Sequence, residues 1–130
     1  MINFTFMEAI SIQGTHKTPS VDFNSEHGKL EIRGRSNPEN SKVFYNPLLE
    51  WIDDYVNHPH DKTTVVVQLE HFNTISSKSL LDLFKRLKTI TNSEKELIIN
   101  WYYEKDDEDL MDAGKNYEHI TGIPFEMIPY

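Results

Sequence analysis

The stretch TVVVQLEHFNTISSKSLLDLFKRL, residues 64–87, decides the fold of this chain. Its first part, Val65–Leu69, is a short run rich in β-branched residues, which is typical of a strand covered on both faces. Further along, apolar residues recur at the spacing of one helix face: Leu80, Leu83, Phe84, Leu87 and Ile90. The stretch therefore predicts a strand, a hydroxyl-rich turn at residues 73–78, and an amphipathic helix.

The turn between this strand and this helix is a position where an anion is well stabilised. A group there lies at the C-terminal end of a strand and the N-terminal end of a helix, where backbone N–H groups are free and the helix dipole is positive. In one interpretation, Asn73 or Thr74 only caps the helix, and Ser76 and Ser77 are ordinary first-turn residues. In the other, Thr74 is phosphorylated, which adds about −1.5 to −2 charges. Lys78 lies one turn further on the same face, either as an exposed lysine or as a partial counter-charge.

Length and charge limit the classes of protein to which the chain can belong. With 130 residues, it is expected to form a single domain over residues 1–130. The net charge of −8 argues against binding to nucleic acid or anionic membranes, and the lack of cysteine excludes disulfides, thiol catalysis and thiolate metal sites. The N-terminus has no cationic segment before its apolar residues, and no apolar run approaches the ~18 residues that span a bilayer. We therefore expect a soluble, cytoplasmic protein that does not insert into membranes.

The rest of the chain predicts three strands, followed by alternating helices and strands. The expected elements are strands at 6–12, 18–23 and 29–33, a helix spanning 44–55, a strand at 64–69, a helix at 76–91, a strand at 96–103, a helix at 107–120 and a short strand at 125–128. Pro47 interrupts the first helical pattern, so that helix either kinks there or begins anew with Pro47 in its first turn. The alternation implies right-handed crossovers and an α/β fold with a mixed or mostly parallel sheet. Because the early strands alternate polar and apolar residues, we expect the helices mainly on one face of the sheet.

Sequence patterns typical of enzymes are mostly missing. The chain has no G-x-G-x-x-G, no P-loop and no G-x-S-x-G. His58 and His60 lie close together either as metal ligands or, as we prefer, in a solvated turn. The acidic run 106–109 is expected to cap the last helix rather than to bind calcium, and Trp101-Tyr102-Tyr103 to lie in the core rather than to stack a ligand. We therefore expect no catalytic residue, no metal and no cofactor.

The order of the elements resembles that of the SpoIIAA-like (STAS) anti-sigma factor antagonists. In those proteins, an Asp-Ser pair at this strand-to-helix junction carries the phosphorylated serine, and Asn73-Thr74 stands in the matching place. Ile75-Ser76-Ser77-Lys78 occupies the place of the Gly-Leu-Gly that usually follows. The resemblance implies a SpoIIAA/STAS-like single domain with a mixed sheet and about three helices. Anti-sigma factor antagonism and STAS-like binding of a small molecule are the alternative functions that it suggests.

Two separate motifs resemble those of the SiaC family of regulatory phosphoproteins more closely. The family pattern is similar to Asn-Thr-Ser-Ser-x-Lys at the junction and Pro-Glu-Asn-Ser before the first helix. This chain has Asn73-Thr74-Ile75-Ser76-Ser77-Lys78 and Pro38-Glu39-Asn40-Ser41, and the similarity spans residues 14–125. Loops that leave neighbouring strands at one sheet edge converge, so we expect residues 38–41 beside Thr74, either as part of a docking surface or as a simple helix cap.

The resemblance to the SiaC family implies a partner-switching protein that is not an enzyme. A cognate Ser/Thr kinase with a histidine-kinase-like ATPase fold would phosphorylate Thr74, and a PPM-type phosphatase would remove the phosphate. The unphosphorylated form would bind and activate a diguanylate cyclase, which raises cyclic di-GMP and favours biofilm formation.

Overall fold

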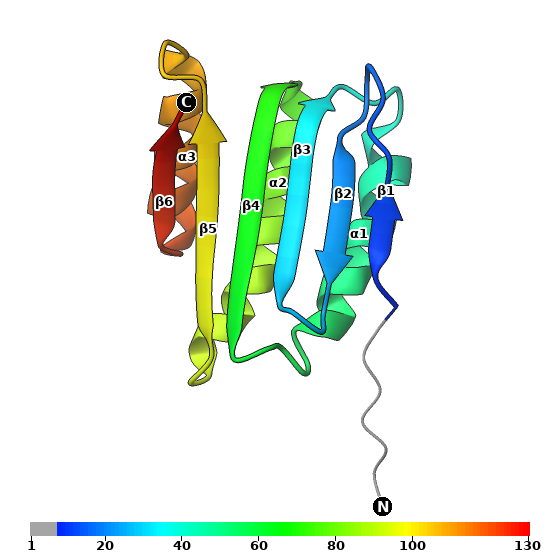
Figure 1. Ribbon diagram of the computed structural model, residues 1–130, viewed down its shortest axis with the longest axis vertical. Coiled ribbons are helices and arrows are strands. Elements are labelled where there is room, and N and C mark those ends of the chain that lie inside the picture. The colour runs from blue at the N-terminus through cyan, green and yellow to red at the C-terminus, as the bar shows by residue number, and fades with distance from the viewer. Residues whose placement is uncertain (1–7) are drawn as a thin grey trace, which may run out of the picture.

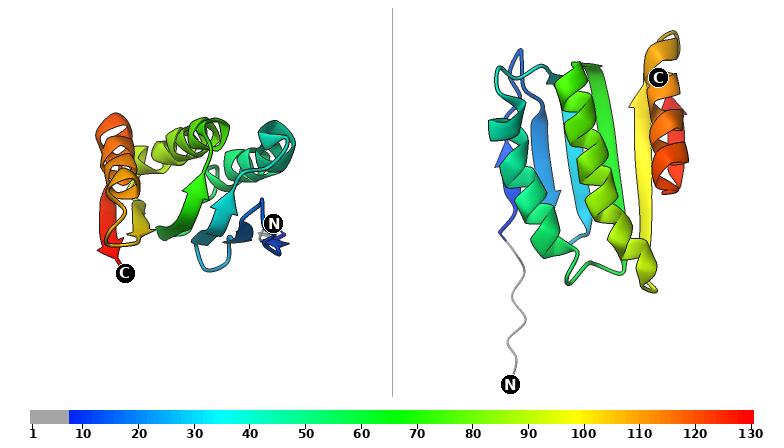
Figure 2. Two further views of the ribbon diagram at one scale, coloured as in Figure 1. Left: turned by 90° about the horizontal axis from the view of Figure 1, so that it is seen from above. Right: turned by 180° about the vertical axis from the view of Figure 1, so that it is seen from behind.

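The three α-helices of the described chain lie on the same face of one six-stranded sheet (Figures 1 and 2). The computed structural model describes residues 8–130. In chain order, the elements are β1 (Ile10–Ile12), β2 (Ser20–Asn24), β3 (Lys29–Ser36), α1 (Ser41–Tyr55), β4 (Lys62–Phe72), α2 (Thr74–Leu87), the 3₁₀ helix η1 (Lys88–Asn92), β5 (Glu96–Tyr103), α3 (Glu108–Thr121) and β6 (Phe125–Pro129). The predicted α/β fold, with a mixed sheet and helices on one face, is confirmed.

The strands lie in the sheet in the same order as in the chain. β1, β2 and β3 are antiparallel neighbours, whereas β3, β4, β5 and β6 run parallel to one another. Each parallel pair is joined through one α-helix, α1, α2 or α3, and the connection from β4 to β5 also contains η1. Right-handed crossovers that always step in the same direction along a sheet place every connecting helix on the same face.

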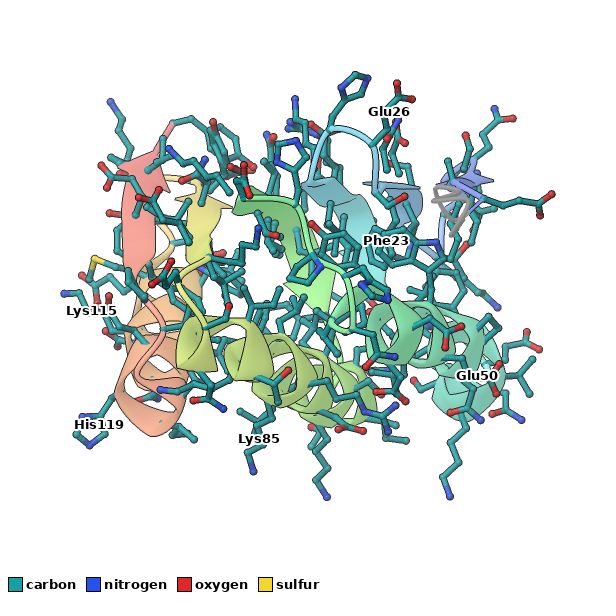
Figure 3. The ribbon with its side chains drawn as sticks, turned by 90° about the horizontal axis from the view of Figure 1, so that it is seen from below. Phe23, Glu26, Glu50, Lys85, Lys115 and His119 are labelled. Atoms are coloured by element: carbon teal, nitrogen blue, oxygen red, sulfur yellow. The ribbon has the colours of Figure 1, made fainter. Side chains whose placement is uncertain are left out.

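The core fills the space between the sheet and the helices, as Phe23 illustrates in Figure 3, where charged side chains such as Glu50 and Lys85 extend away from the sheet. The side chains of β4 and α2 that meet in this core are at most 1% exposed: Val65, Val67, Leu69, Leu80, Leu83, Phe84 and Leu87. The periodicity of residues 64–87 therefore predicted correctly which side chains are buried.

The other face of β4 differs from the prediction of a strand covered on both faces. Thr64 and Gln68 on that face are only half-buried, because no helix packs against it. Val66 is nevertheless 4% exposed, since it lies between Glu31 of β3 and Asn100 of β5 in the sheet register. The run of valines marks the centre of the sheet rather than a strand between two helical layers.

Several predicted boundaries need correction; the strands expected at 29–33 and 64–69, for example, extend to Ser36 and over Lys62–Phe72. The strand expected at 6–12 is observed only as β1, Ile10–Ile12, and positions 6 and 7 lie outside the described residues. The helix expected at 76–91 begins at Thr74 and ends at Leu87, after which the chain continues as η1. The first helix does not begin at Pro47, because Asn40 caps it at Ser41 and Pro47 lies inside it.

No helix in residues 8–130 is both long and apolar enough to cross a membrane.

Helix α3 packs so tightly on the sheet that it requires a glycine at position 114. A Cβ atom there would lie 2.6 Å from Cδ1 of Trp101, whose Nε1 donates a hydrogen bond of 2.9 Å to the carbonyl oxygen of Leu110. Because this bond fixes the indole ring, the clash cannot be relieved by a small movement of the side chain.

We predict that Gly114→Ala lowers the free energy of unfolding by about 1–3 kcal/mol, although alanine favours helices. Urea denaturation measures this difference. Asn116→Ala, at an exposed position of the same helix, serves as the control and should cause no loss of stability. Equal stabilities of the two variants would contradict the tight packing described above.

Candidate functional site

The loops that follow β3 and β4 are held together by the backbone and side chain of Asn73. Its backbone N–H donates to the carbonyl oxygen of Ser36 (3.0 Å), and its Nδ2 donates to Oδ1 of Asn37 (2.7 Å). Residues 38–41 follow directly and lead into α1. The first turns of α1 and α2 thus lie near one another at the C-terminal end of the parallel strands (Figure 2).

Asn73, and not Thr74, is the cap of α2. The Oδ1 atom of Asn73 accepts a hydrogen bond of 2.7 Å from the backbone N–H of Ser76, with the backbone of Asn73 in an extended conformation. Thr74 is the first residue of the helix and is exposed, and within residues 8–130 its hydroxyl forms no hydrogen bond. The capping role that the sequence left open between the two residues therefore belongs to Asn73.

Ser76 lies in a buried chain of hydroxyl groups beneath the start of α2. Ser36 Oγ donates to Ser76 Oγ at 2.9 Å and lies 2.5 Å from the hydroxyl of Tyr45. Because a serine hydroxyl has a single hydrogen, which Ser36 gives to Ser76, the hydroxyl of Tyr45 must be the donor to Ser36. Ser76 is fully buried, so its hydroxyl is not accessible in the folded protein.

Ser77 is engaged with α3. The hydroxyl of Tyr117 donates to the carbonyl oxygen of Ser77 at 3.0 Å and lies 2.9 Å from Ser77 Oγ, from which it accepts. Of the three hydroxyl-bearing residues at the start of α2, only Thr74 therefore presents a free hydroxyl to solvent. Lys78, one turn after Thr74, is also exposed.

The residues of the motif 38–41 have separate structural roles. Pro38 is buried, and the exposed carboxylate of Glu39 forms an ion pair of 3.1 Å with Lys17. Asn40 caps α1, because its Oδ1 accepts from the backbone N–H of Val43 at 3.2 Å. Ser41 is 4% exposed, and its Oγ has no hydrogen-bond partner in the described part of the chain.

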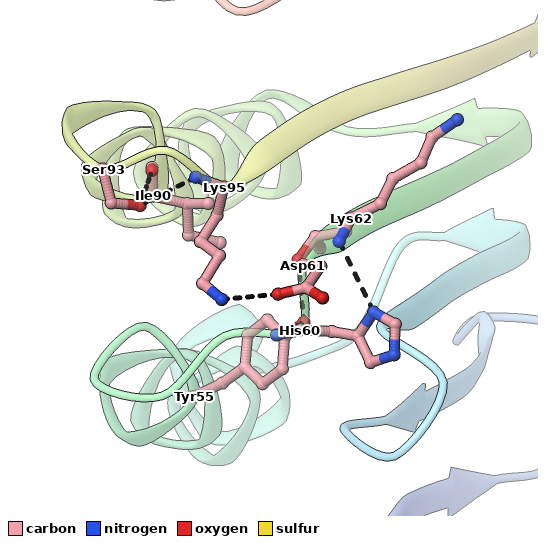
Figure 4. Close-up of polar contacts among 8 residues, drawn as sticks. Tyr55, His60, Asp61, Lys62, Ile90, Ser93 and Lys95 are labelled. Atoms are coloured by element: carbon pink, nitrogen blue, oxygen red, sulfur yellow. Dashed lines mark hydrogen bonds and ion pairs between the residues drawn. The ribbon is translucent and has the colours of Figure 1, made fainter.

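The other candidates that the sequence raised are accounted for elsewhere in the fold. His60 is exposed in the turn before β4, where its Nδ1 accepts from the backbone N–H of Lys62 at 3.4 Å (Figure 4). Asp61 beside it forms an ion pair of 2.5 Å with Lys95, which lowers the pKa of that carboxyl. Across residues 8–130, no group of three or more His, Asp or Glu side chains is placed to hold a metal ion.

The acidic run has the structural role that the sequence predicted, and so do two of the three aromatic residues; the prediction of a core position is wrong for Tyr102. Trp101 and Tyr103 are buried, while Tyr102 faces the open side of the sheet, with the guanidinium of Arg33 5.9 Å from its ring centre. Asp107 caps α3 by accepting from the backbone N–H of Leu110 at 3.0 Å. We see no ligand-stacking role for Trp101, because its ring lies in the core against the rings of Tyr117 and Phe125.

The family model described as SiaC family regulatory phosphoprotein matches residues 12–130. Among curated proteins, an uncharacterised protein of Pseudomonas aeruginosa (strain UCBPP-PA14) is 23% identical over 119 residues, which cover 92% of this chain and 94% of that protein. Among solved structures, apo-SiaC from Pseudomonas aeruginosa matches with a TM-score of 0.84 at 22% identity, covering 94% of this chain and 99% of that one. A chain in the crystal structure of the diguanylate cyclase SiaD in complex with its activator SiaC, from the same organism, matches with a TM-score of 0.86 at 21% identity, covering 93% of this chain and 99% of that one. These structures share the fold described above.

The buried hydroxyl chain leads to a prediction about stability. Ser76→Ala removes the acceptor of the Ser36 hydroxyl in a buried site, so we expect the free energy of unfolding to fall by about 1–3 kcal/mol. Ser41→Ala is the matched control: it removes an equally buried hydroxyl that forms no hydrogen bond, and stability should be unchanged or slightly higher. Chemical denaturation of both variants measures these free energies of unfolding. Equal losses in the two variants would show that the hydrogen bonds of the hydroxyl chain do not contribute to stability.

Two buried tyrosines predict a loss of stability at alkaline pH. Burial raises the pKa of Tyr45 and of Tyr117 above the ordinary value of 10.0. The unfolded chain then releases these protons at lower pH than the folded protein, so the free energy of unfolding falls as pH rises above about 10. We expect the fall to be shallower in Tyr45→Phe, as measured by denaturation at a series of pH values. An identical slope in wild type and variant would contradict this assignment.

Proposed function

Because the chain belongs to the SiaC family of regulatory phosphoproteins, we propose that it is a partner-switching protein controlled by phosphorylation of Thr74. The observation that carries this proposal is the free hydroxyl of Thr74. It is exposed at the first position of α2, whereas Ser76 is buried and Ser77 is bonded to Tyr117. A kinase that reaches this surface finds only one available acceptor among the three.

The local structure is suited to a phosphate on Thr74. The backbone N–H groups of the first helical residues have no partner within a helix, and the dipole there favours a negative charge. At α2, the capping of Ser76 by Asn73 leaves the N–H groups of Thr74 and Ile75 for this purpose, and the ammonium of Lys78 lies one turn away. Since a helix N-terminus accepts an anion without rearrangement, the modified protein keeps its backbone fold.

Membership of the family, together with one solved complex of a relative, supports the proposed partners. The neighbouring structure of SiaD with its activator SiaC supports the proposal that the unphosphorylated form of this chain binds and activates a diguanylate cyclase. A Ser/Thr kinase with a histidine-kinase-like ATPase fold adds the phosphate, and a PPM-type phosphatase removes it. The output is a change in cyclic di-GMP and in biofilm formation, and the protein works in the cytoplasm, where ATP is available to the kinase. It has no catalytic role of its own.

Phosphorylation would act on the interface rather than on the fold. A phosphate adds about −1.5 to −2 charges and three acceptor oxygens at the contact surface. Burying such a group against an apolar or acidic partner requires its desolvation, which is enough to break an interface. The protein therefore alternates between a binding and a non-binding form with the same framework.

The test is mass spectrometry of the protein from its native cells, together with cells that lack the phosphatase. We expect a phosphate-sized mass increment whose fragment ions localise it to Thr74. It should be lost in Thr74→Ala and retained in Thr74→Ser, which keeps an acceptor hydroxyl at the same position. Thr74→Glu should weaken binding to the cyclase at least tenfold. A protein that stays unmodified in all these cells, or that is modified on Ser77, would overturn the proposal and lead the search to bound small molecules or to a sigma-factor pathway.

A further inference from the structure

The two most exposed large apolar side chains of residues 8–130 lie in the first turns of α1 and α2. Val43 is 69% exposed and Ile75 is 58% exposed, compared with 56% for Ile120, 47% for Tyr130 and 36% for Ile12. Their helices start at the same end of the sheet, where the loops are joined through Asn73 (Figure 2). Ile75 follows Thr74 directly in the first turn of α2, and Val43 lies in the first turn of the neighbouring helix α1.

The stability of the fold does not explain these two residues. At exposed helical positions, β-branched residues are poorer helix formers than alanine, lysine or glutamate. In a first turn, acidic residues are favoured because they complement the helix dipole. Helix α3 follows this rule with Glu108 and Asp109, whereas the first turns of α1 and α2 contain no acidic residue. The start of α1 and α2 is thus apolar at positions where folding alone favours polar or acidic side chains.

Two exposed lysines lie close to Val43 and Ile75 in the chain. Lys42 lies in the first turn of α1 and Lys78 follows the first turn of α2; both are exposed, and within the described residues neither forms an ion pair. The uncompensated dipoles of the two helices add to this positive charge. The exposed carboxylate of Glu39, just before α1, is paired with Lys17 and so is not paired with Lys42 or Lys78. We call Lys42, Val43, Thr74, Ile75 and Lys78 the docking surface.

An apolar centre with a positive rim complements an apolar pocket bordered by carboxylates. We infer that the diguanylate cyclase bound by the unphosphorylated protein presents such a pocket, into which Val43 and Ile75 insert. This inference rests on the proposed function and adds the chemistry of the partner. It also explains why a phosphate on Thr74 separates the two proteins: it would place a hydrated dianion next to Ile75 and opposite the partner's carboxylates.

The test measures the affinity of the purified unphosphorylated protein for the purified cyclase by titration calorimetry. We expect Val43→Ser and Ile75→Ser each to weaken binding at least tenfold. Ile120→Ser is the matched control, since Ile120 is about as exposed as Ile75 but lies near the C-terminal end of α3. The affinity of this variant for the cyclase should stay within twofold of wild type. Circular dichroism verifies that the variants are folded, as expected for exposed positions.

The positive rim is tested with charge reversals on α2. Lys78→Glu should weaken binding severalfold and reduce its dependence on salt concentration. Lys85→Glu, about two turns further along the same helix and directed away from the sheet in Figure 3, should have little effect. Equal effects of the two reversals would overturn the assignment of a positive rim.

The outcomes separate this inference from the proposed function. A wild-type protein that binds the cyclase, with Val43→Ser and Ile75→Ser binding equally well, would overturn the inference alone. The two variants could instead bind the cyclase with full affinity but no longer be phosphorylated by the kinase. That result would assign the docking surface to the kinase and would also overturn the inference. A wild-type protein that binds no diguanylate cyclase would overturn the proposed function and the inference together.

Discussion

The hydrogen bonds of Asn73 are the interactions on which the starts of α1 and α2 depend. The side-chain oxygen of this residue caps α2 and the side-chain nitrogen bonds Asn37, while the backbone N–H bonds Ser36. One residue thereby sets where α2 begins and where the start of α1 lies relative to it. Because Asn73 caps the helix, the hydroxyl of Thr74 is not needed as a cap and forms no hydrogen bond within the described residues. A hydroxyl that had to cap the helix would have its acceptor electrons already engaged, and its modification would disturb the fold.

The fold followed from the sequence because its signals are local. The valine run, the helical spacing after residue 80 and the alternation of elements all act within a few residues, and together they specify the sheet and the side on which the helices lie. Which hydroxyl groups at the start of α2 are hydrogen-bonded depends on contacts between residues that are distant in the sequence. Only the folded chain brings Tyr45 to Ser36 and Tyr117 to Ser77, and so distinguishes the free Thr74 from its engaged neighbours. The open face of β4 was missed for the same reason, since a valine run does not reveal which of its faces a helix will cover.

The site combines a rigid foundation with a changeable surface. Beneath the start of α2, a buried chain of hydroxyl groups links β3, α1 and α2 through Ser36, Tyr45 and Ser76. Above it, Thr74 presents an exposed hydroxyl in the first turn of α2. In the proposed switch, the charge at the surface changes while the foundation does not. This separation suits a protein whose two forms must be recognised by different partners, because each partner meets the same backbone with a different charge.

The order of the strands has a consequence for how the protein is made. Each strand pairs with the strand that precedes it in the chain, so no strand must be inserted between two that are already in place. A growing chain can therefore add one strand and its covering helix at a time as it leaves the ribosome, with each new unit docking on the edge of those already formed. The free edge of the last strand formed is exposed only until the next strand emerges and pairs with it. By this order of assembly, the docking surface is complete once α2 has formed, before the last strand of the sheet has been synthesised.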